Sequence, residues 1–260
     1  MPSIVCANGV RIAYCEQGPT DAEPVVFLHG FTGTAASHFA AEMPLLATTM
    51  HVYGLDLPGY GASAPPYRIF GADFYERDAR DVISFITTLD IGPVHLVGFS
   101  DGSEAAVMIA ALAPELVRSV LAWGICGQIA PEMVARVRKW LPVDAWGPEK
   151  DIWKQEIIDT QGIDQLEPLI TGWVDAAERI SARGGDILHA IAHRVSAPIL
   201  IVHGSADVGN PIPVVTALCA KMPNARLVIL DNVGHSVQDD APYELHALMR
   251  EFYGIPQTEF

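Results

Sequence analysis

The feature that most constrains the fold of this chain is a sharp turn predicted between a strand and a helix at residues 98–102. Its sequence, Gly98-Phe99-Ser100-Asp101-Gly102, follows an apolar run at residues 93–97 and precedes an alanine-rich helical pattern at residues 104–112. A serine with glycines two positions before and after it, placed between a strand and a helix, is the pattern of a nucleophile elbow. Side chains at the glycine positions would collide with their neighbours in so tight a turn. We therefore predict that Ser100 stands clear of the sheet, with the N-terminus of the helix pointing at it.

Strand and helix patterns alternate along most of the chain, which predicts an α/β fold with a mostly parallel central sheet flanked by helices. The chain opens with a predicted hairpin, with strands at about residues 3–7 and 10–15 joined by Asn8-Gly9. Asn-Gly is typical of two-residue turns, and such a turn would place Cys6 opposite Arg11. The other strand patterns are apolar runs at residues 24–28, 51–56, 93–97, 119–123, 198–203 and 226–230, and helices are predicted near residues 37–48, 72–90, 104–112 and 243–252.

The alternation is interrupted between residues 127 and 185, which hold three helical patterns and no convincing strand. Four of the five tryptophans, Trp140, Trp146, Trp153 and Trp173, lie in this segment. Loops after parallel strands leave the carboxyl edge of the sheet, so an insertion there would form a lid over a site at that edge. We predict a core domain of residues 1–126 and 186–260 and a helical cap of residues 127–185. The alternative is ordinary helical packing, with the tryptophans as its core.

Composition restricts the partners and the compartment. Half of the 260 residues are apolar, which suffices for one large core, and the formal net charge of −15 argues against nucleic acid or an anionic membrane as a partner. We expect no signal peptide, and no apolar run approaches the ~20 residues of a membrane span. The four cysteines show no C-x-x-C spacing, so reduced thiols in a cytoplasmic protein are the simplest expectation.

No sequence motif indicates a metal or a cofactor. His189 and His193 have the i, i+4 spacing of helix-borne metal ligands, but the glutamate of the H-E-x-x-H pattern is absent. No glycine-rich motif for nucleotide phosphates opens a helix. We therefore expect no metal and no cofactor, and the sequence leaves the oligomeric state open.

Two later positions supply the partners that a serine nucleophile needs. A serine hydroxyl becomes reactive when a histidine takes its proton, and a carboxylate holds that histidine in the correct tautomer. After a nucleophile elbow, the acid and then the histidine follow in sequence, each on a loop after a strand. Asp207 comes directly after one strand pattern, and His235 comes directly after the next. We predict a catalytic triad of Ser100, Asp207 and His235, with Asp231 as the alternative acid.

Hydrolysis also needs hydrogen-bond donors for the oxyanion of the tetrahedral intermediate, worth about 3–4 kcal/mol each. The backbone N–H of the residue after the nucleophile supplies one donor, here Asp101, and the loop after the third strand supplies the other. That loop reads His29-Gly30-Phe31, so we predict the Phe31 N–H as the second donor of the oxyanion hole.

These motifs together resemble the α/β-hydrolase superfamily over nearly the whole chain. The resemblance rests on His29-Gly30, residues 56–63 (DLPGYGAS), the elbow, the Asp207 loop and Gly234-His235. More narrowly, the chain is similar to the valacyclovir hydrolase (biphenyl hydrolase-like) group of serine esterases. That similarity rests on residues 72–79 (ADFYERDA), Gly-x-Ser-Asp-Gly at the elbow, Trp123-Gly124 and Trp173-Val174-Asp175.

The narrower resemblance implies hydrolysis of α-amino acid esters, with Asp101 binding the substrate's ammonium group and with Phe31 and Trp123 as further substrate-binding residues. The alternative for Asp101 is that it only starts a helix, where a negative charge is favoured by about 0.3–1 kcal/mol. Two positions depart from the group. Phe31 stands where the group has a flexible methionine, and Ser103 replaces a frequent third glycine.

The sequence as a whole predicts a serine hydrolase that cleaves small carboxylic esters through an acyl-enzyme, in an α/β-hydrolase fold with an inserted cap. Two alternatives use the same triad: a carbon–carbon bond hydrolase and a perhydrolase. The chain lacks the Gly-Pro-Gly oxyanion loop of the former, and both commonly have methionine where Asp101 stands. A third alternative is a non-catalytic sensor that keeps the fold and holds a small molecule in its pocket.

Overall fold

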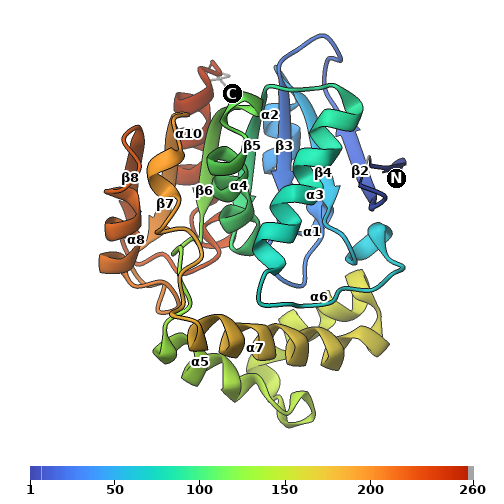
Figure 1. Cartoon of the computed structure of the whole chain (residues 1–260), viewed down its shortest axis with the longest axis vertical. Coiled ribbons are helices and arrows are strands. Elements are labelled where there is room, and N and C mark those ends of the chain that lie inside the picture. Colours follow the sequence, from blue (N-terminus) through green and yellow to red (C-terminus); the bar gives the residue numbers. More distant parts are fainter. Residues whose placement is uncertain (7, 257–260) are drawn as a thin grey trace.

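The structure, a computed structural model, describes residues 1–6 and 8–256 and contains an eight-stranded sheet with helices on both faces (Figure 1). The strand order is β1-β2-β4-β3-β5-β6-β7-β8. From β4 to β8 all neighbouring strands are parallel, whereas β2 runs antiparallel to both β1 and β4, which confirms the predicted fold class. The strands are β1 Ser3–Val5, β2 Arg11–Gln17, β3 Pro24–Leu28, β4 His51–Asp56, β5 Val94–Phe99, β6 Val117–Trp123, β7 Ile199–Gly204 and β8 Ala225–Leu230.

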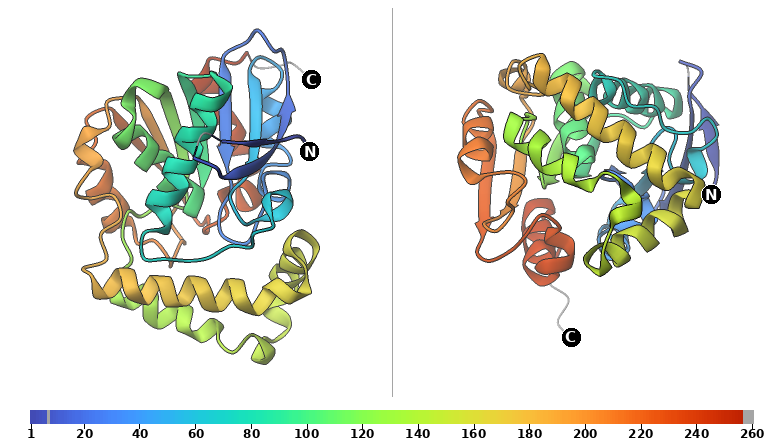
Figure 2. Two further views of the ribbon diagram at one scale, coloured as in Figure 1. Left: turned by 45° about the vertical axis from the view of Figure 1, so that its right-hand side comes forward. Right: turned by 90° about the horizontal axis from the view of Figure 1, so that it is seen from below.

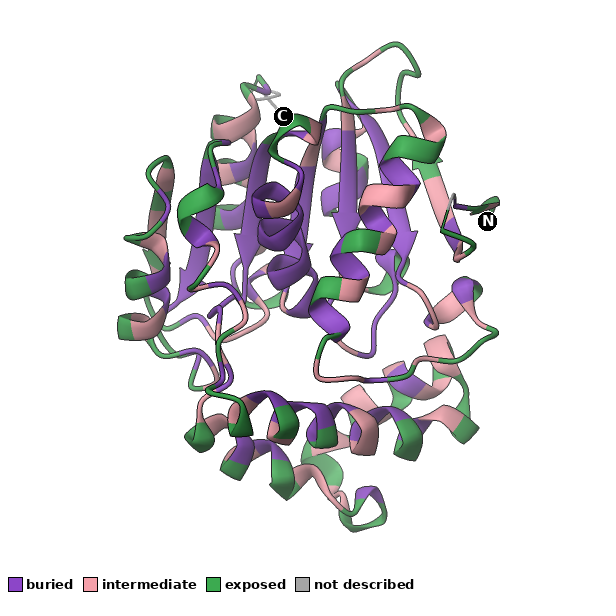
Figure 3. Cartoon of the chain, viewed as in Figure 1, coloured by how far each residue is buried: buried purple, intermediate pink, exposed green. Residues whose placement is uncertain are grey.

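Each face of the sheet builds its own core, because alternate residues of a strand point to opposite faces. In β3, Val26 and Leu28 belong to the core under α3, α4 and α8, whereas Val25 and Phe27 belong to the core under α1, α2, α9 and α10. Figure 3 shows the central strands buried between these layers. The helices are α1 Ala35–His38, α2 Glu42–Leu46, α3 Phe74–Leu89, α4 Asp101–Leu112, α8 Ile212–Cys219, α9 Val237–Asp240 and α10 Pro242–Tyr253.

Between β6 and β7 the chain forms three further helices, α5 Pro131–Val137, α6 Asp151–Gln161 and α7 Leu166–Ala182. Figures 1 and 2 show them lying across one end of the sheet. An isolated β-bridge between Gln128 and Asp186 joins the two ends of this segment. We call residues 127–185 the cap, and its status as a separate domain stays a prediction. None of the described helices is long and apolar enough to cross a lipid bilayer.

The N-terminal hairpin is offset by one residue from the predicted register, because Arg11 lies opposite Val5 and not opposite Cys6. Two hydrogen bonds of 2.8 Å, from the Cys6 N–H to the Val10 carbonyl and from the Gly9 N–H to the Cys6 carbonyl, enclose a loop longer than two residues. Gly9 has φ +83°, the left-handed conformation that closes such a longer loop. Ala7, which the predicted first strand included, lies outside the described residues.

Candidate active site

Ser100 lies at the turn between β5 and α4, with φ +53° and ψ −121°. The turn is so closely packed that a Cβ on Gly98 would lie 2.5 Å from the Gly102 carbonyl oxygen, and a Cβ on Gly102 would collide with the Leu28 carbonyl oxygen. Ser103 Oγ lies 2.7 Å from the carbonyl oxygens of both Gly98 and Trp123. Ser103 thus ties α4 to β5 and β6, which a third glycine could not do.

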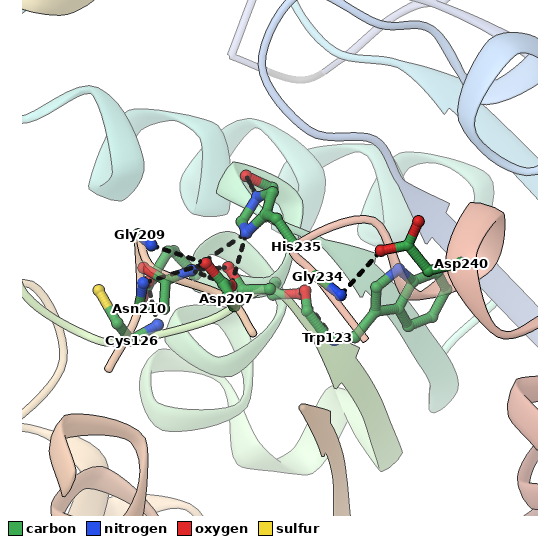
Figure 4. Close-up of polar contacts among 12 residues, drawn as sticks. Trp123, Cys126, Asp207, Gly209, Asn210, Gly234, His235 and Asp240 are labelled. Atoms are coloured by element: carbon green, nitrogen blue, oxygen red, sulfur yellow. Dashed lines mark hydrogen bonds and ion pairs between the residues drawn. The ribbon is translucent and has the colours of Figure 1, made fainter. Parts of the chain in front are cut away.

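His235 connects Ser100 to Asp207. Its Nε2 lies 3.0 Å from Ser100 Oγ, and its Nδ1 lies 2.8 Å from Asp207 Oδ2. The three side chains follow three different parallel strands, β5, β7 and β8, whose carboxyl ends meet at one edge of the sheet. Figure 4 shows Asp207 and His235 facing one another. Asp231, the alternative acid, is exposed, and it is Asp207 that contacts His235.

Asp207 is buried and accepts several hydrogen bonds besides that of His235. The backbone N–H groups of Gly209 and Asn210 donate to its Oδ1 at 2.9 and 3.1 Å. Burial acts to raise the pKa of Asp207, but the hydrogen bond and charge of His235 and the N–H of Asn210 hold it below its ordinary value. Asp207 is therefore an ionised acceptor for the His235 Nδ1 proton.

Two further side chains fix the loops of the acid and the histidine, and sequence reasoning missed both. Asn210 Nδ2 donates to Asp207 Oδ2 at 3.1 Å and to the Gly124 carbonyl at 3.0 Å. Asp240 of α9 accepts the Gly234 N–H at 2.7 Å, next to the histidine (Figure 4). The only sequence signal for Asn210 is its place in the polar turn that Asp207 begins.

The loop after β3 passes directly beside Ser100, since a Cβ on Gly30 would lie 2.9 Å from Ser100 Cβ. His29 anchors this loop from the core: its Nε2 accepts the Leu57 N–H at 2.9 Å, and burial lowers the pKa of His29 to about 3. Phe31 and Asp101 border the same cavity as Ser100. Within residues 1–6 and 8–256, neither of their backbone N–H groups donates to a protein acceptor. Two unpaired donors therefore accompany the serine.

The cap helix α6 holds the same loop from the other side. Gln161 Nε2 donates to the carbonyl oxygens of Thr32 and Gly33 at 3.0 and 3.1 Å. Trp153 Nε1 donates to Thr32 Oγ1 at 2.9 Å. Thr32 has φ +66°, which is rare for a β-branched residue, so these contacts stabilise a conformation that the loop alone would not favour.

A cavity of about 530 Å³ lies between the core and the cap, with Ser100 and His235 in its wall. Three tryptophans, Trp140, Trp153 and Trp173, stand on its cap side. The Phe31 ring packs against this wall, with its centroid 5.4 Å from that of Trp173 and 6.3 Å from that of Trp140. A concave, mostly apolar site with a few polar groups suits a small organic molecule.

Asp101 is buried at the start of α4 and borders the cavity. Tyr75 donates its hydroxyl to Oδ1 at 2.8 Å, and Trp173 donates its Nε1–H to Oδ2 at 2.9 Å. Burial raises the pKa of Asp101 to about 6, although both hydrogen bonds act to lower it. Asp101 is thus a desolvated carboxyl group beside the serine, held by one residue of the core and one of the cap.

Glu104, which sequence reasoning also missed, borders the cavity one helical turn after Asp101. Its Oε1 accepts the backbone N–H groups of Cys126 and Gly127 at 3.0 and 2.9 Å. Its Oε2 is buried and has no partner among the described residues. Burial raises the pKa of Glu104 to about 7, against the lowering effect of the two N–H groups.

Trp123 does not reach the cavity, contrary to its predicted role in substrate binding. Its side chain is fully buried on the α1 and α10 face of the sheet, where its ring packs against Phe39 and its Nε1 donates to Gln238 Oε1 at 2.7 Å. The period-two alternation of β6 explains this, since Trp123 points to the same face as Leu121. Its backbone contacts the elbow: the carbonyl accepts the Ser100 N–H at 2.9 Å and the Ser103 hydroxyl at 2.7 Å, and the N–H lies 3.2 Å from Ser103 Oγ.

The fold and this arrangement of residues define a hydrolase of the α/β-hydrolase fold. The chain belongs to the alpha/beta hydrolase family, whose model matches residues 25–248. It is 31% identical to the human serine hydrolase BPHL over 205 aligned residues. The alignment covers 78% of this chain and 69% of that protein. The mouse serine hydrolase BPHL is 28% identical over 250 residues, covering 95% of this chain and 84% of that protein. These matches confirm the resemblance drawn from the sequence motifs.

Solved structures confirm the fold independently. A hydrolase from Pseudomonas aeruginosa PA01 superposes with a TM-score of 0.75 and covers 97% of this chain and 98% of that chain. The sequence identity is 18%, so this likeness concerns the fold alone.

Glu104→Gln tests the buried carboxyl group. The folded-state pKa of about 7 exceeds the ordinary value of 4.5, so folding favours the protonated form and the stability that this group contributes falls as the pH rises through that interval. Glutamine keeps an acceptor for the two N–H groups but cannot ionise. We expect the variant to gain on the order of 2 kcal/mol of unfolding free energy relative to wild type between about pH 5 and pH 8, measured by urea denaturation. Glu115→Gln, at an exposed position after α4, is the control. If the free energy of unfolding changed with pH equally in the wild type and in Glu104→Gln, this account would be contradicted.

Proposed function

We propose that this hydrolase cleaves carboxylic esters through an acyl-enzyme formed on Ser100. The observation that carries the proposal is the hydrogen-bonded series from Ser100 through His235 to Asp207, with separations of 3.0 and 2.8 Å. It borders an aromatic cavity together with the two unpaired N–H groups of Phe31 and Asp101. A nucleophile, a base, an orienting acid and oxyanion donors are thus all within reach of one bound ester.

In the first half-reaction, His235 Nε2 takes the proton of Ser100 Oγ as this oxygen attacks the ester carbonyl carbon. The carbonyl oxygen becomes an oxyanion, which accepts hydrogen bonds from the N–H groups of Phe31 and Asp101. The bond to the alcohol oxygen then breaks, and His235 gives the proton to that oxygen. Water attacks the acyl-enzyme by the same proton transfers, which releases the acid and restores Ser100.

Asp207 orients His235 and stabilises its charge during both half-reactions. Because its Oδ2 accepts the Nδ1 proton of His235, the lone pair of Nε2 is directed at Ser100. When His235 becomes an imidazolium, the ionised Asp207 stabilises the new positive charge. Asn210 and Gly209 share the charge of Asp207 through their N–H groups, so the carboxylate stays in place throughout.

Asp101 favours esters that carry an α-amine. Its N–H is the proposed oxyanion donor, and its carboxyl group borders the same cavity. One residue therefore brings both groups close to the ester that reacts with Ser100. A carboxylate has about four acceptor positions, of which Tyr75 and Trp173 occupy two. An ammonium group would use the remainder and would compensate the burial of the charge. The similarity to the serine hydrolase BPHL supports the serine mechanism and leaves the ester class to experiment.

Turnover of 4-nitrophenyl esters and amino acid esters tests ester hydrolysis. We expect hydrolysis by the wild type and a loss of at least about 10³-fold in kcat for Ser100→Ala and for His235→Ala, because each removes a group that acts in the transition state. A fluorophosphonate should label the wild type and not Ser100→Ala. No Ser100-dependent turnover of any ester, together with no labelling, would reject the proposal and leave the carbon–carbon hydrolase, the perhydrolase and the sensor.

Two aspartates offer a matched test of the orienting acid. Asp207→Asn removes the acceptor of the His235 proton, so we expect kcat to fall by about 10³-fold or more. Asp231→Asn, an exposed position on the loop of the histidine, should leave kcat unchanged.

The ratio of kcat/KM for an α-amino ester to that for a neutral ester of equal length tests Asp101. Ionisation of Asp101 creates the ammonium site, so this ratio should rise as the pH passes about 6. The ratio cancels any effect of pH on the steps that both substrates share. Asp101→Asn should abolish the rise and reduce the ratio by at least about tenfold. An equal loss on both esters would instead make Asp101 a structural residue.

Gln161→Ala tests the contact of the cap with the oxyanion loop. Without Gln161, the Gly33 carbonyl loses its side-chain donor and the Thr32 carbonyl keeps only Thr160, so the Phe31 N–H is held less firmly in position. We expect kcat on a neutral ester to fall about tenfold with little change in KM, because the donor acts on the transition state. Gln155→Ala on the same helix is the control, since its side chain is exposed and contacts Asp159. An unchanged kcat in Gln161→Ala would show that the loop keeps its shape without α6.

A further inference from the structure

One face of α5 borders the cavity. Met133, Arg136 and Val137 of α5, and Trp140 of the 3₁₀ helix that follows, have the i, i+3, i+4, i+7 spacing of a single helix face. All four border the cavity. Three of them are apolar or aromatic, whereas elsewhere the cap wall also carries Gln128, Glu149, Lys150 and Glu156. Arg136 alone brings a guanidinium group to this face.

The guanidinium group of Arg136 has no partner within the described residues, 1–6 and 8–256. Its side chain forms no ion pair or hydrogen bond there, and its Nε is buried without an acceptor. Arg138, two positions further along, pairs with Glu178 on the outside of the cap. A shortage of acids does not explain the difference, because the chain has 31 acidic and 16 basic residues. A partly buried cation without a counter-charge is stabilised when a ligand brings an anion.

Among the described residues, no acidic side chain around the cavity forms an ion pair with Arg136. On the cap, Glu156 lies 3.2 Å from His38 Nε2, and Glu149 has no ion pair there. On the core, Asp101 is held by Tyr75 and Trp173, Glu104 by two backbone N–H groups, and Asp207 by His235. The positive charge of Arg136 is therefore available to a ligand.

We propose that Arg136 binds a carboxylate that the ester substrate carries at a position remote from its ester bond. This inference rests on the proposed ester hydrolysis and names a substrate class for the same site. A guanidinium group offers two parallel N–H donors that match the two oxygens of a carboxylate. Arg136 is half-buried in the cavity wall, and partial burial strengthens the attraction between opposite charges.

Paired esters that differ by one carboxylate test the proposal. For a carboxylate on the acyl side, the probes are the 4-nitrophenyl monoesters of adipic and suberic acid, compared with the esters of hexanoic and octanoic acid. For a carboxylate on the alcohol side, the probes are 4-acetoxybenzoate and its methyl ester. We expect the wild type to prefer the charged member of at least one pair by about tenfold in kcat/KM. The pair that shows the preference tells on which side of the ester the carboxylate lies.

Arg136→Gln should remove this preference by raising KM for the charged ester, with kcat and the neutral ester unaffected. Arg136→Lys, which keeps the charge but not the paired donors, should retain part of it. Arg138→Gln is the matched control and should behave as the wild type. The proposal is overturned if the wild type hydrolyses neutral esters as well as charged ones, or if Arg136→Gln weakens both equally.

The failure of ester hydrolysis itself is a separate outcome. If the wild type cleaves no ester of either kind, the proposed function is wrong, and binding of adipate by calorimetry then tests Arg136 directly. Adipate that binds the wild type and not Arg136→Gln supports the carboxylate site. Equal binding, or no binding to either protein, overturns it.

Discussion

The close approach of two backbones at the elbow determines where the rest of the site lies. The start of α4 presses against the end of β3 so closely that no side chain fits on Gly102, and Gly30 passes Ser100 at a similar distance. The serine, the N-terminus of α4 and the loop after β3 therefore share one small space. The nucleophile and the two unpaired N–H groups lie together as a consequence of this single packing constraint. The loops after β7 and β8 then only have to reach the same edge of the sheet.

The parts of this arrangement that the sequence predicts are those with a local signal. Each member of the Ser100, Asp207 and His235 set directly follows an apolar strand pattern, and parallel strands bring such positions to one edge. Gln161 and Thr32, in contrast, are 129 residues apart, and neither carries a signal for the other. The same holds for Asn210 and Gly124, and for Glu104 and the N–H groups of the β6 loop. Pairings between distant segments require the fold itself.

Three differences between the structure and the predictions from sequence have simpler physical reasons. The alternation along β6 places Trp123 on the face away from the cavity, and a count of strand positions relative to Leu121 would have shown it. The hairpin register depends on one extra loop residue, which a dipeptide pattern does not reveal. The helix α8 was not predicted, because its sequence is apolar almost throughout and includes prolines at its start, so it lacks the amphipathic spacing of a surface helix.

The bridge between Gln128 and Asp186 brings the two ends of the cap together as it leaves and rejoins the core. A segment whose ends meet can be lengthened, shortened or exchanged without changing the distance between β6 and β7. Mutation can therefore reshape the outer wall of the cavity, and with it the choice of substrate, while the inner half with the serine and histidine stays fixed. The helix α6 limits this freedom, because its hydrogen bonds to Thr32 tie changes in this part of the cap to changes in the loop after β3.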